Sequence, residues 1–440
     1  MRKLTKQYFI DLLILSFPLF IGNLGHTLIG ATDVLVVAKY SIDALAAISI
    51  ANSILFTIFI LGIGILCAIS ILLSNLRGAG HKTKKHLLST LIFSSITAFF
   101  FSGVCYASKF FIPMINFEEH IVPYIEQYIA IASFSMLGMF LFEGIKQFLQ
   151  SYEIVNFPNA LLLVSVVLNL IFDIAFVFGF GPIPSMGVKG AAIATTLVRT
   201  LMGIIMFVYV FRFIDFKSKI DIGYMKQIIK VGTPIGIALL LEFLAFNIIT
   251  ILVGRESGLL AAVHSILVTI SSATFMFPLS IATATSVKVA YFYGAKKCDE
   301  IKNYVIASTT MSLLIMVLIS LCLILFPSQI IRLFTNDNAV LKIAVPVMSV
   351  VAAYQIFDGL QVVMGGTLKG FKMTKFVTGA VLAGYWLVGA PVAVVCVGIF
   401  DMSLRGYWIA LAVSLCVMGI MQTAMAKYKY KQVKEMYTNL

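Results

Sequence analysis

Long apolar runs separated by short basic loops dominate the pattern of this 440-residue chain. An apolar run of about 18 residues or more is typical of a helix that crosses a bilayer. The runs predict twelve transmembrane helices, at residues 9–38, 44–74, 87–112, 121–150, 157–180, 189–214, 228–253, 259–291, 301–326, 340–368, 376–400 and 405–426. We therefore expect an all-α fold, a twelve-helix transmembrane bundle.

Composition agrees with this pattern, because 60% of the residues are hydrophobic and only 12% are charged. The net charge of +13 does not indicate nucleic acid, since the basic residues lie in short loops between apolar runs. The six cysteines show no CxxC spacing, so we predict neither disulfides nor a cysteine metal site. The basic N-terminus continues into an apolar run without a cleavage site, which favours an uncleaved first span over a signal peptide.

The distribution of lysine and arginine predicts the orientation. The loops on one side, which include Arg2 and Lys3, hold 23 of these residues, and the loops on the other side hold 7. Basic loops stay in the cytoplasm. With an even number of spans, both termini are expected to be cytoplasmic.

The two halves of the chain repeat each other at an offset of about 216 residues. The anchors are Pro18 with Pro234, Ala46–Ala47 with Ala261–Ala262, Gly78–Ala79 with Gly294–Ala295, and Gly190 with Gly406. Six spans lie within each period, so the halves insert the same way up and form a parallel repeat. We expect two pseudo-symmetric six-helix lobes, at 1–214 and 228–440, a cytoplasmic linker at 215–227, and a substrate site between the lobes.

Two acids are predicted at a similar depth in the N-terminal lobe. Asp33 lies late in the first span and Asp173 late in the fifth, with Asn169 one turn before Asp173 on the same helical face. Two carboxylates with an amide oxygen suit a small hard cation such as Na⁺. A carboxyl pair that carries a proton is the other interpretation.

A second polar region is predicted in the C-terminal lobe. Asp358 shares one face of the tenth span with Tyr354, Gln355 and Gln361. Such a face would be stranded in hydrocarbon, so it is expected to line a cavity. Glu242 lies at a comparable depth in the seventh span, and a buried ionised acid costs about 2.5–3.5 kcal/mol there.

The eighth span carries a polar stripe that has two interpretations. Its members are Ser265, Thr269, Ser272, Met276 and Thr283. They either line the substrate cavity or pack against a neighbouring helix, because small polar residues are also common at helix–helix contacts in membranes.

Three further charges have structural interpretations. Glu143 is expected to pair with Lys146, three residues on, and Lys288 is expected to extend toward the membrane surface. Arg199 is expected to pair with a carboxylate of its own lobe.

Motifs of soluble enzymes are absent from the sequence. It contains no P-loop, no HExxH pair and no GxSxG elbow, so we expect neither an enzyme nor ATP-driven transport. No cofactor is expected beyond a coupling ion. We expect a monomer whose partners are the lipid bilayer and small organic molecules.

With these residues identified, the chain resembles a multidrug and toxic compound extrusion (MATE) transporter of the multidrug/oligosaccharidyl-lipid/polysaccharide exporter superfamily. The resemblance covers nearly the whole chain. It rests on TDVLVVAKYSIDALAAISIANSI, VLNLIFDIAFVFGFGPIPSMGVKGAAIAT, GTPIGIALLLEF, AAVHSILVTISSATFMFPLSIATATSVKVAYFYGA and YQIFDGLQVVMGGTLKGFKMTKF.

The resemblance implies two six-helix lobes that rock to give access from alternate sides. It also implies a cation site in the N-terminal lobe, made by Asp33, Asn169, Asp173 and Thr195. The acids Glu242 and Asp358 match the bacterial NorM-like branch, where such acids serve cation coupling and substrate binding. This chain departs from that branch at Asp173, where a neutral amide is common.

We therefore hypothesise a Na⁺- or H⁺-coupled antiporter in a bacterial inner membrane that exports organic, mainly cationic compounds. A lipid-linked oligosaccharide flippase of the same superfamily is the alternative, and it would need a cationic cavity. An integral membrane enzyme and an ion channel are the other rivals. The sequence shows no clustered metal or nucleophile site, which disfavours an enzyme. Two pseudo-symmetric lobes suit a rocking movement better than a pore, which disfavours a channel.

Overall fold

The computed structural model describes residues 6–115, 117–182 and 184–438, and every element in these residues is a helix. The helices of the first half are α1 (Lys6–Val37), α2 (Ile42–Gly78), η1 (Thr83–His86), α3 (Leu87–Ser108), η2 (Lys109–Ile115), α4 (Val122–Ala132), α5 (Ser135–Gln150), α6 (Asn156–Phe178) and α7 (Val188–Phe211). Those of the second half are α8 (Ile222–Glu256), α9 (Gly258–Gly294), α10 (Cys298–Leu325), α11 (Pro327–Arg332), α12 (Asn338–Gly370), α13 (Thr374–Val381), η3 (Leu382–Gly389), α14 (Ala390–Ala393), η4 (Val394–Ile399) and α15 (Ser403–Thr438).

The membrane-spanning helices confirm the predicted fold class. Eleven helices of the described residues are long and apolar enough to cross a bilayer. The twelfth is the pair α4 and α5, which is bent by 43° at a short break and matches the fourth predicted span. At the break, the Ser102 hydroxyl donates to the carbonyl oxygen of Ser133 at 2.9 Å, so the interrupted backbone is partly satisfied by α3.

Three details differ from the sequence-based expectation or lie beyond the structure. Helix α8 begins at Ile222, inside the segment 215–227 that was expected to be a linker. The eleventh span is not a uniform α-helix, because η3 and η4 are π-helical and flank α14, which contains Pro391. Arg2 and Lys3, which contribute to the predicted orientation, lie outside the described residues.

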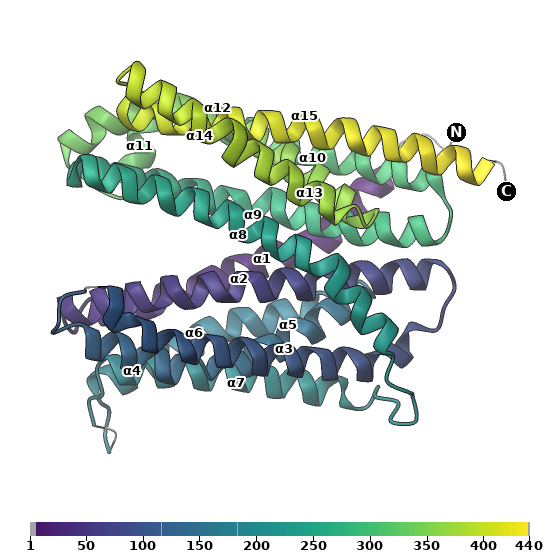
Figure 1. Ribbon diagram of the computed structural model, residues 1–440, viewed down its shortest axis with the longest axis horizontal. Helices are drawn as coiled ribbons and strands as arrows, with labels where there is room; N and C mark the ends of the chain where they lie inside the picture. Colours follow the sequence, from purple (N-terminus) through teal and green to yellow (C-terminus); the bar gives the residue numbers. More distant parts are fainter. Residues whose placement is uncertain (1–5, 116, 183, 439–440) are drawn as a thin grey trace. The chain divides into compact units, whose positions relative to one another are not determined.

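The chain divides into two compact units, whose helices can be followed by colour in Figure 1. The N-terminal unit consists of Ile21–Leu73 and His81–Gly236. The C-terminal unit consists of Ile237–Leu440 together with Met1–Phe20 and Ser74–Gly80. The beginning of α1 and the end of α2 thus pack with the second half of the chain, whereas the beginning of α8 packs with the first half.

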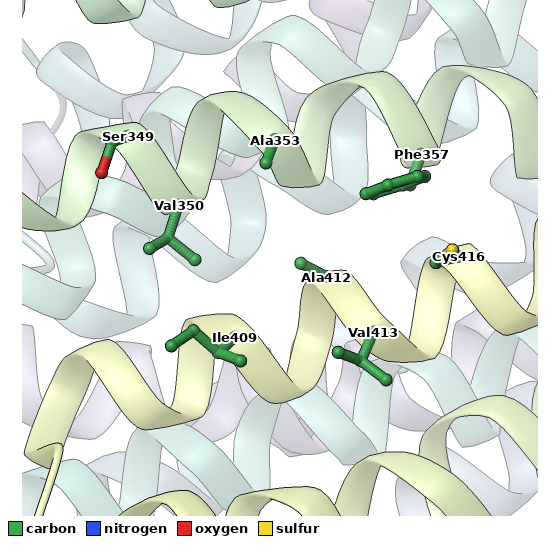
Figure 2. Close-up of a pocket in the computed structure, with 8 residues that line it drawn as sticks. All are labelled: Ser349, Val350, Ala353, Phe357, Ile409, Ala412, Val413 and Cys416. Atoms are coloured by element: carbon green, nitrogen blue, oxygen red, sulfur yellow. The ribbon is translucent and has the colours of Figure 1, made fainter.

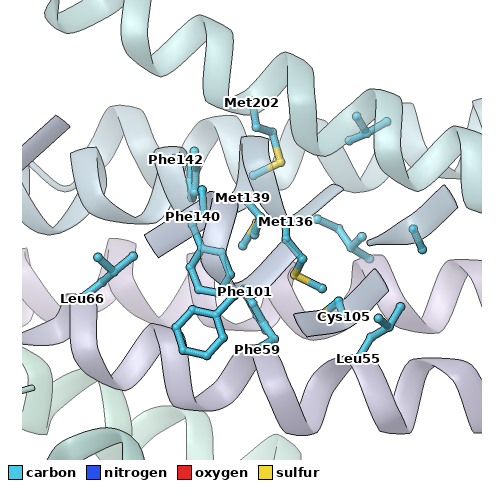
Figure 3. Packing of buried hydrophobic residues seen from close by; sticks show 14 of the residues in the cluster. Leu55, Phe59, Leu66, Phe101, Cys105, Met136, Met139, Phe140, Phe142 and Met202 are labelled. Carbon is cyan, nitrogen blue, oxygen red and sulfur yellow. The ribbon is translucent and has the colours of Figure 1, made fainter. Parts of the chain in front are cut away.

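An aromatic and methionine-rich core holds the N-terminal unit together (Figure 3). The ring of Phe140 on α5 lies 5.4 Å from that of Phe59 on α2 and 5.3 Å from that of Phe101 on α3. Gly62 faces Phe140 so closely that a Cβ there would overlap the ring. Helices α2, α3 and α5 are therefore fixed by tight interdigitation, as expected where lipid tails supply no competing hydrophobic gain.

The core of the C-terminal unit surrounds α12. Trp408 on α15 is fully buried, and its ring lies 5.4 Å from that of Tyr354 on α12. The Tyr354 ring is also 6.5 Å from that of Phe246 on α8. These contacts fix the side of α12 that carries the polar residues predicted from sequence.

Two helix crossings involve the first helix of each half. In the N-terminal unit, α8 crosses α2 through glycines, since a Cβ on Gly232 or Gly236 would overlap the backbone of Ile65 or Leu61. In the C-terminal unit, α1 crosses α9 through stacked rings of Phe20 and Phe277, whose centroids are 4.1 Å apart.

Candidate functional site

The structure brings the predicted acids of the N-terminal half together. Asp33 comes from α1, Asn169 and Asp173 from successive turns of α6, and Thr195 from α7. All four side chains are buried, with exposed fractions of at most 2%. Because Asn169 and Asp173 are four residues apart on one helix, they present their polar groups to the same side.

A short hydrogen-bond network joins these side chains. Asn169 Nδ2 lies 2.7 Å from Asp33 Oδ1 and 2.7 Å from Asp173 Oδ2. The Thr195 hydroxyl donates to Asp33 Oδ2 at 2.8 Å. The carboxyl groups of Asp33 and Asp173 also lie within hydrogen-bonding reach of each other. The amide thus bridges two acids from different helices.

Three members of this network were missed by the sequence analysis. The Tyr128 hydroxyl on α4 lies 3.0 Å from both Asp33 Oδ2 and Asn52 Oδ1. Asn169 Nδ2 is also 3.0 Å from the hydroxyl of Thr32. Asn52 lies in a polar stripe of the second span with Ser49, Ser53 and Thr57, which could have indicated it, whereas only proximity in the fold reveals Tyr128.

The donor set fits a small hard cation. Among the described residues, two buried oxygens of the network have no hydrogen-bond partner, namely Asn169 Oδ1 and Asp173 Oδ1. Together with the Asp33 carboxylate they offer oxygen ligands of the kind that Na⁺ or another hard cation prefers. The same arrangement suits a proton shared by two carboxyls.

The acid on α12 is in a different situation. Asp358 is 1% exposed, and within the described part of the chain neither of its carboxyl oxygens has a hydrogen-bond partner. Of its helix neighbours, Gln355 donates Nε2 to Thr274 Oγ1 on α9 at 2.7 Å. The predicted residues Tyr354, Gln355 and Gln361 are all buried within the unit.

Glu242 on α8 lies close enough to Asp358 for their charges to interact. The Tyr385 hydroxyl in the π-helical segment η3 donates to Glu242 Oε1 at 3.4 Å. Sequence analysis missed Tyr385, and also Gln422 on α15, which is fully buried with both amide atoms unpartnered among the described residues. The interior of this unit therefore contains many polar atoms that the protein itself does not satisfy.

The polar stripe of α9 is less enclosed. Ser265 and Thr269 are exposed, whereas Met276 and Thr283 are half-buried. The Thr269 hydroxyl donates to the carbonyl of Ser265 at 2.8 Å, so it returns to its own helix instead of binding a neighbour. The structure does not join Ser265 or Thr269 to the Glu242–Asp358 region by a hydrogen bond among the described residues.

Of the three predictions made for the remaining intramembrane charges, one is confirmed and two are wrong. Lys146 Nζ lies 2.9 Å from Glu143 Oε2, as expected, and both residues are buried. Lys288 does not extend to the surface, since it is 9% exposed with its ammonium 5.5 Å from the centre of the Tyr304 ring. Arg199 donates to the hydroxyl of Ser135 at 3.0 Å, and no described carboxylate lies within 4 Å of its guanidinium.

A separate groove of about 370 Å³ lies between α12 and α15 of the C-terminal unit (Figure 2). Its lining is apolar except for Ser349 and Cys416. None of the acids or predicted cavity residues lines it. The groove is therefore distinct from the candidate site.

These features define a polytopic, all-helical membrane protein with buried acids in each half, which is the architecture of a secondary transporter. The MatE family profile matches residues 18–175 and again 234–395, so the chain belongs to the MatE family, the multidrug and toxic compound extrusion transporters. The two matches begin 216 residues apart, the same offset as the sequence repeat.

Relatives span nearly the whole chain. The chain is 25% identical over 434 residues to a probable multidrug resistance protein NorM of Photorhabdus laumondii, covering 96% of each sequence. It is 24% identical over 445 residues to the multidrug resistance protein NorM of Vibrio vulnificus, covering 98% of this chain and 97% of that protein.

Solved structures show the same fold. The bent form of the Vibrio cholerae MATE transporter VcmN matches with a TM-score of 0.89 at 18% identity, covering 99% of each chain. A transporter of the wider superfamily from Pyrococcus furiosus matches with a TM-score of 0.88 at 18% identity, covering 97% of each chain.

Proposed function

We propose that this protein is a cation-coupled antiporter that exports organic, mainly cationic compounds by alternating access. The observation that carries the proposal is the presence of four intramembrane carboxylates besides the Glu143–Lys146 pair, two in each half, of which Asp358 has no hydrogen-bond partner among the described residues. Intramembrane acids are expensive and mark ion and substrate pathways. The names of the relatives, multidrug resistance proteins, agree with this class of cargo.

In the proposed mechanism, the N-terminal acids bind the coupling ion. The Asn169 amide, which now directs its nitrogen to Asp33 and Asp173, can rotate by half a turn and present its oxygen to a cation. Arrival of a proton or Na⁺ removes negative charge from the pair and replaces the hydrogen bonds that the amide donates. That exchange links ion binding to the packing of α1 against α6.

The C-terminal acids Glu242 and Asp358 attract the cargo in this mechanism. The charges of Glu242 and Asp358 influence each other, and a cation interacts more strongly with such acids at low dielectric than in water. Tyr354, beside Asp358, adds an aromatic face of the kind that binds organic cations. Cargo and coupling ion therefore bind to separate groups of acids, and alternating access couples the two binding events.

The membrane potential supplies sufficient energy for such an exchange. One elementary charge crossing 100 mV provides about 2.3 kcal/mol. That energy sustains a cargo gradient of roughly forty-fold. With the predicted orientation, both termini face the cytoplasm of a bacterial cell and cargo moves outward.

Counterflow in proteoliposomes tests the proposal. Preloaded cargo should leave when an inward Na⁺ gradient or an inward proton gradient is applied, and the effective gradient identifies the ion. Asp33→Asn and Asp358→Asn should lower the driven flux at least about thirtyfold, since an interaction with a charged group contributes about 2–3 kcal/mol.

Glu119→Gln is the matched control, because it removes an exposed acid outside the spans. If both aspartate variants transport at the rate of this control, the assignment of the coupling acids is wrong. If neither gradient drives any cargo in the unaltered protein, the antiporter itself is refuted.

A further inference from the structure

The end of α2 belongs to a different compact unit from the rest of the helix. Ile42–Leu73 packs in the N-terminal unit, whereas Ser74–Gly80 packs with helices of the C-terminal unit. The helix continues without a break to Gly78. A movement of the N-terminal unit is therefore transmitted to this segment through a continuous helix, because an α-helix is stiff along its axis.

Within the C-terminal unit, this segment crosses the end of α9 at very short range. A Cβ on Gly78 would overlap the carbonyl oxygen of Tyr291, and a Cβ on Gly294 would overlap that of Asn75. The contact is reciprocal under the internal repeat, because Gly78 and Gly294 are 216 positions apart, as are Asn75 and Tyr291. The Gly–Ala anchors of the sequence repeat are thus the point where the two equivalent helices touch.

Polar contacts hold the crossing in place. Asn75 Nδ2 donates to the carbonyl oxygen of Ala290 at 3.1 Å, and Lys372 Nζ donates to Asn75 Oδ1 at 2.6 Å. The guanidinium of Arg77 lies 4.8 Å from the centre of the Tyr291 ring, at cation–π distance. Both ends of the Asn75 amide are therefore engaged by residues of the second half of the chain.

Lys372 follows the C-terminal end of α12. Its φ of 61° is in the left-handed region that non-glycine residues rarely adopt. It lies in the loop between α12 and α13, and burial lowers the pKa of its ammonium group. No described carboxylate lies within 4 Å of that group, and its partner is the neutral Asn75 amide.

The α9 side of the crossing is anchored independently. The Tyr437 hydroxyl of α15 donates to the carbonyl oxygen of Tyr293 at 3.0 Å, and the Tyr293 ring lies 5.5 Å from that of Phe371. The end of α9 is thus tied to α15 and to the residue beside Lys372. The α2 segment is the partner that can leave.

We propose that the α2–α9 crossing is a latch that closes the side of the membrane on which the chain termini lie. The latch consists of Asn75, Arg77 and Gly78 on one side and Tyr291, Gly294 and Lys372 on the other. It opens when cargo enters from that side and closes before release. The proposal rests on the alternating access proposed above.

Cross-linking tests whether the latch must open. In a chain whose six cysteines are replaced by alanine, Ala79→Cys and Ala295→Cys place thiols on the two sides of the crossing. Joining them with a short bifunctional thiol reagent that reductant cleaves should abolish export, and reductant should restore it. Each single-cysteine variant should export at an unchanged rate after the same treatment. Full export by the cross-linked protein would overturn the proposal.

A second measurement does not depend on cargo. Lys372→Ala should increase the rate at which Ala295→Cys, which is half-buried at the crossing, reacts with a membrane-impermeant maleimide on the terminus side by several-fold, because the latch spends more time open. Lys375→Ala is the matched control, since it removes an exposed charge three residues away, in the first turn of α13, and should leave the rate unchanged. Equal labelling rates in the Lys372→Ala and Lys375→Ala variants would show that Lys372 is not part of the latch.

The two measurements separate this proposal from the proposed function. If the protein exports no cargo, and the cysteine is nevertheless labelled faster in Lys372→Ala, the latch is present without the antiporter activity. A protein that exports normally while cross-linked has the activity without the latch.

Discussion

The acids of the two halves differ in how the protein compensates their charge. Asp33 accepts hydrogen bonds from Asn169, Thr195 and Tyr128, all within 3.0 Å. Asp358 accepts none from the described residues, although it is equally buried. In the N-terminal group both oxygens of Asp33 accept hydrogen bonds, and Asn169 Oδ1 and Asp173 Oδ1 are left unpartnered among the described residues. In the C-terminal group both carboxyl oxygens of Asp358 are unpartnered in that part of the chain.

Because of this difference, substitutions in the two groups should affect stability in different ways. Removing one partner from a satisfied buried network leaves donors without acceptors, which is costly. Removing an unpaired buried charge takes away a penalty. Substitutions of the two acids should therefore change the stability of the protein in opposite directions, even though both abolish coupled transport under our proposal.

The largest effect is expected for Asp33→Ala. It leaves an amide and two hydroxyls without their acceptor, and each unsatisfied group costs about 1–3 kcal/mol. We expect a loss of about 3 kcal/mol in the free energy of unfolding, measured by denaturant titration in detergent. Asp33→Asn retains the shape and an acceptor oxygen and should lose less. Equal stability of Asp33→Ala and the unaltered protein would show that the network is not stabilising.

Asp358→Leu is expected to have the opposite sign. Replacing a buried ionic group by an apolar residue of similar volume often stabilises a protein, by about 1–4 kcal/mol where ion pairs were replaced. We expect a gain of about 1–2 kcal/mol together with complete loss of driven transport. A destabilised Asp358→Leu protein would indicate that the carboxylate is satisfied by a partner, and the contrast between the halves would fail.

A smaller change is expected for Thr195→Val, which removes one hydroxyl donor from Asp33 while keeping the side-chain shape. One hydrogen bond to a charged group contributes about 1.5 kcal/mol, so the affinity for the coupling ion should change about tenfold. The concentration of Na⁺ or H⁺ that gives half-maximal transport measures this. Thr196→Val is the matched control, because that hydroxyl bonds to backbone carbonyls instead.

The smallest effect is expected for Tyr385→Phe. Its hydrogen bond to Glu242 is long, at 3.4 Å, so it contributes little. Transport and its ion dependence should change less than about threefold, which corresponds to about 0.6 kcal/mol. A much larger loss would show that the C-terminal acids depend on defined partners as the N-terminal acids do.

The spans and the grouping of acids could be predicted from the sequence, for physical reasons. A helix that crosses hydrocarbon needs a long apolar run, so the spans could be recognised. The depth of each residue in its span and its helical phase then predicted that Asp33, Asn169 and Asp173 lie at one level. Tyr128 could not be found this way, because it approaches Asp33 from α4, beyond the reach of periodicity.

Other features depend on tertiary packing that a single helix does not encode. The π-helical turns around Pro391 and the bend between α4 and α5 arise where neighbouring helices accept an irregular backbone. Lys288 was expected at the surface because its long side chain can extend there, but it is buried with its ammonium group beside the Tyr304 ring.

The crossings at Phe20 and Gly236 bear on the origin of the chain as a tandem duplication. These residues occupy equivalent places in the repeat, 216 positions apart, and so do their partners Phe277 and Leu61. One crossing is a pair of stacked rings, and the other leaves no room for even a methyl group on Gly236. A chain made of two copies of the first half would have phenylalanine at the position of Gly236, where the crossing has no room for it. The two halves have therefore diverged so far that one can no longer replace the other.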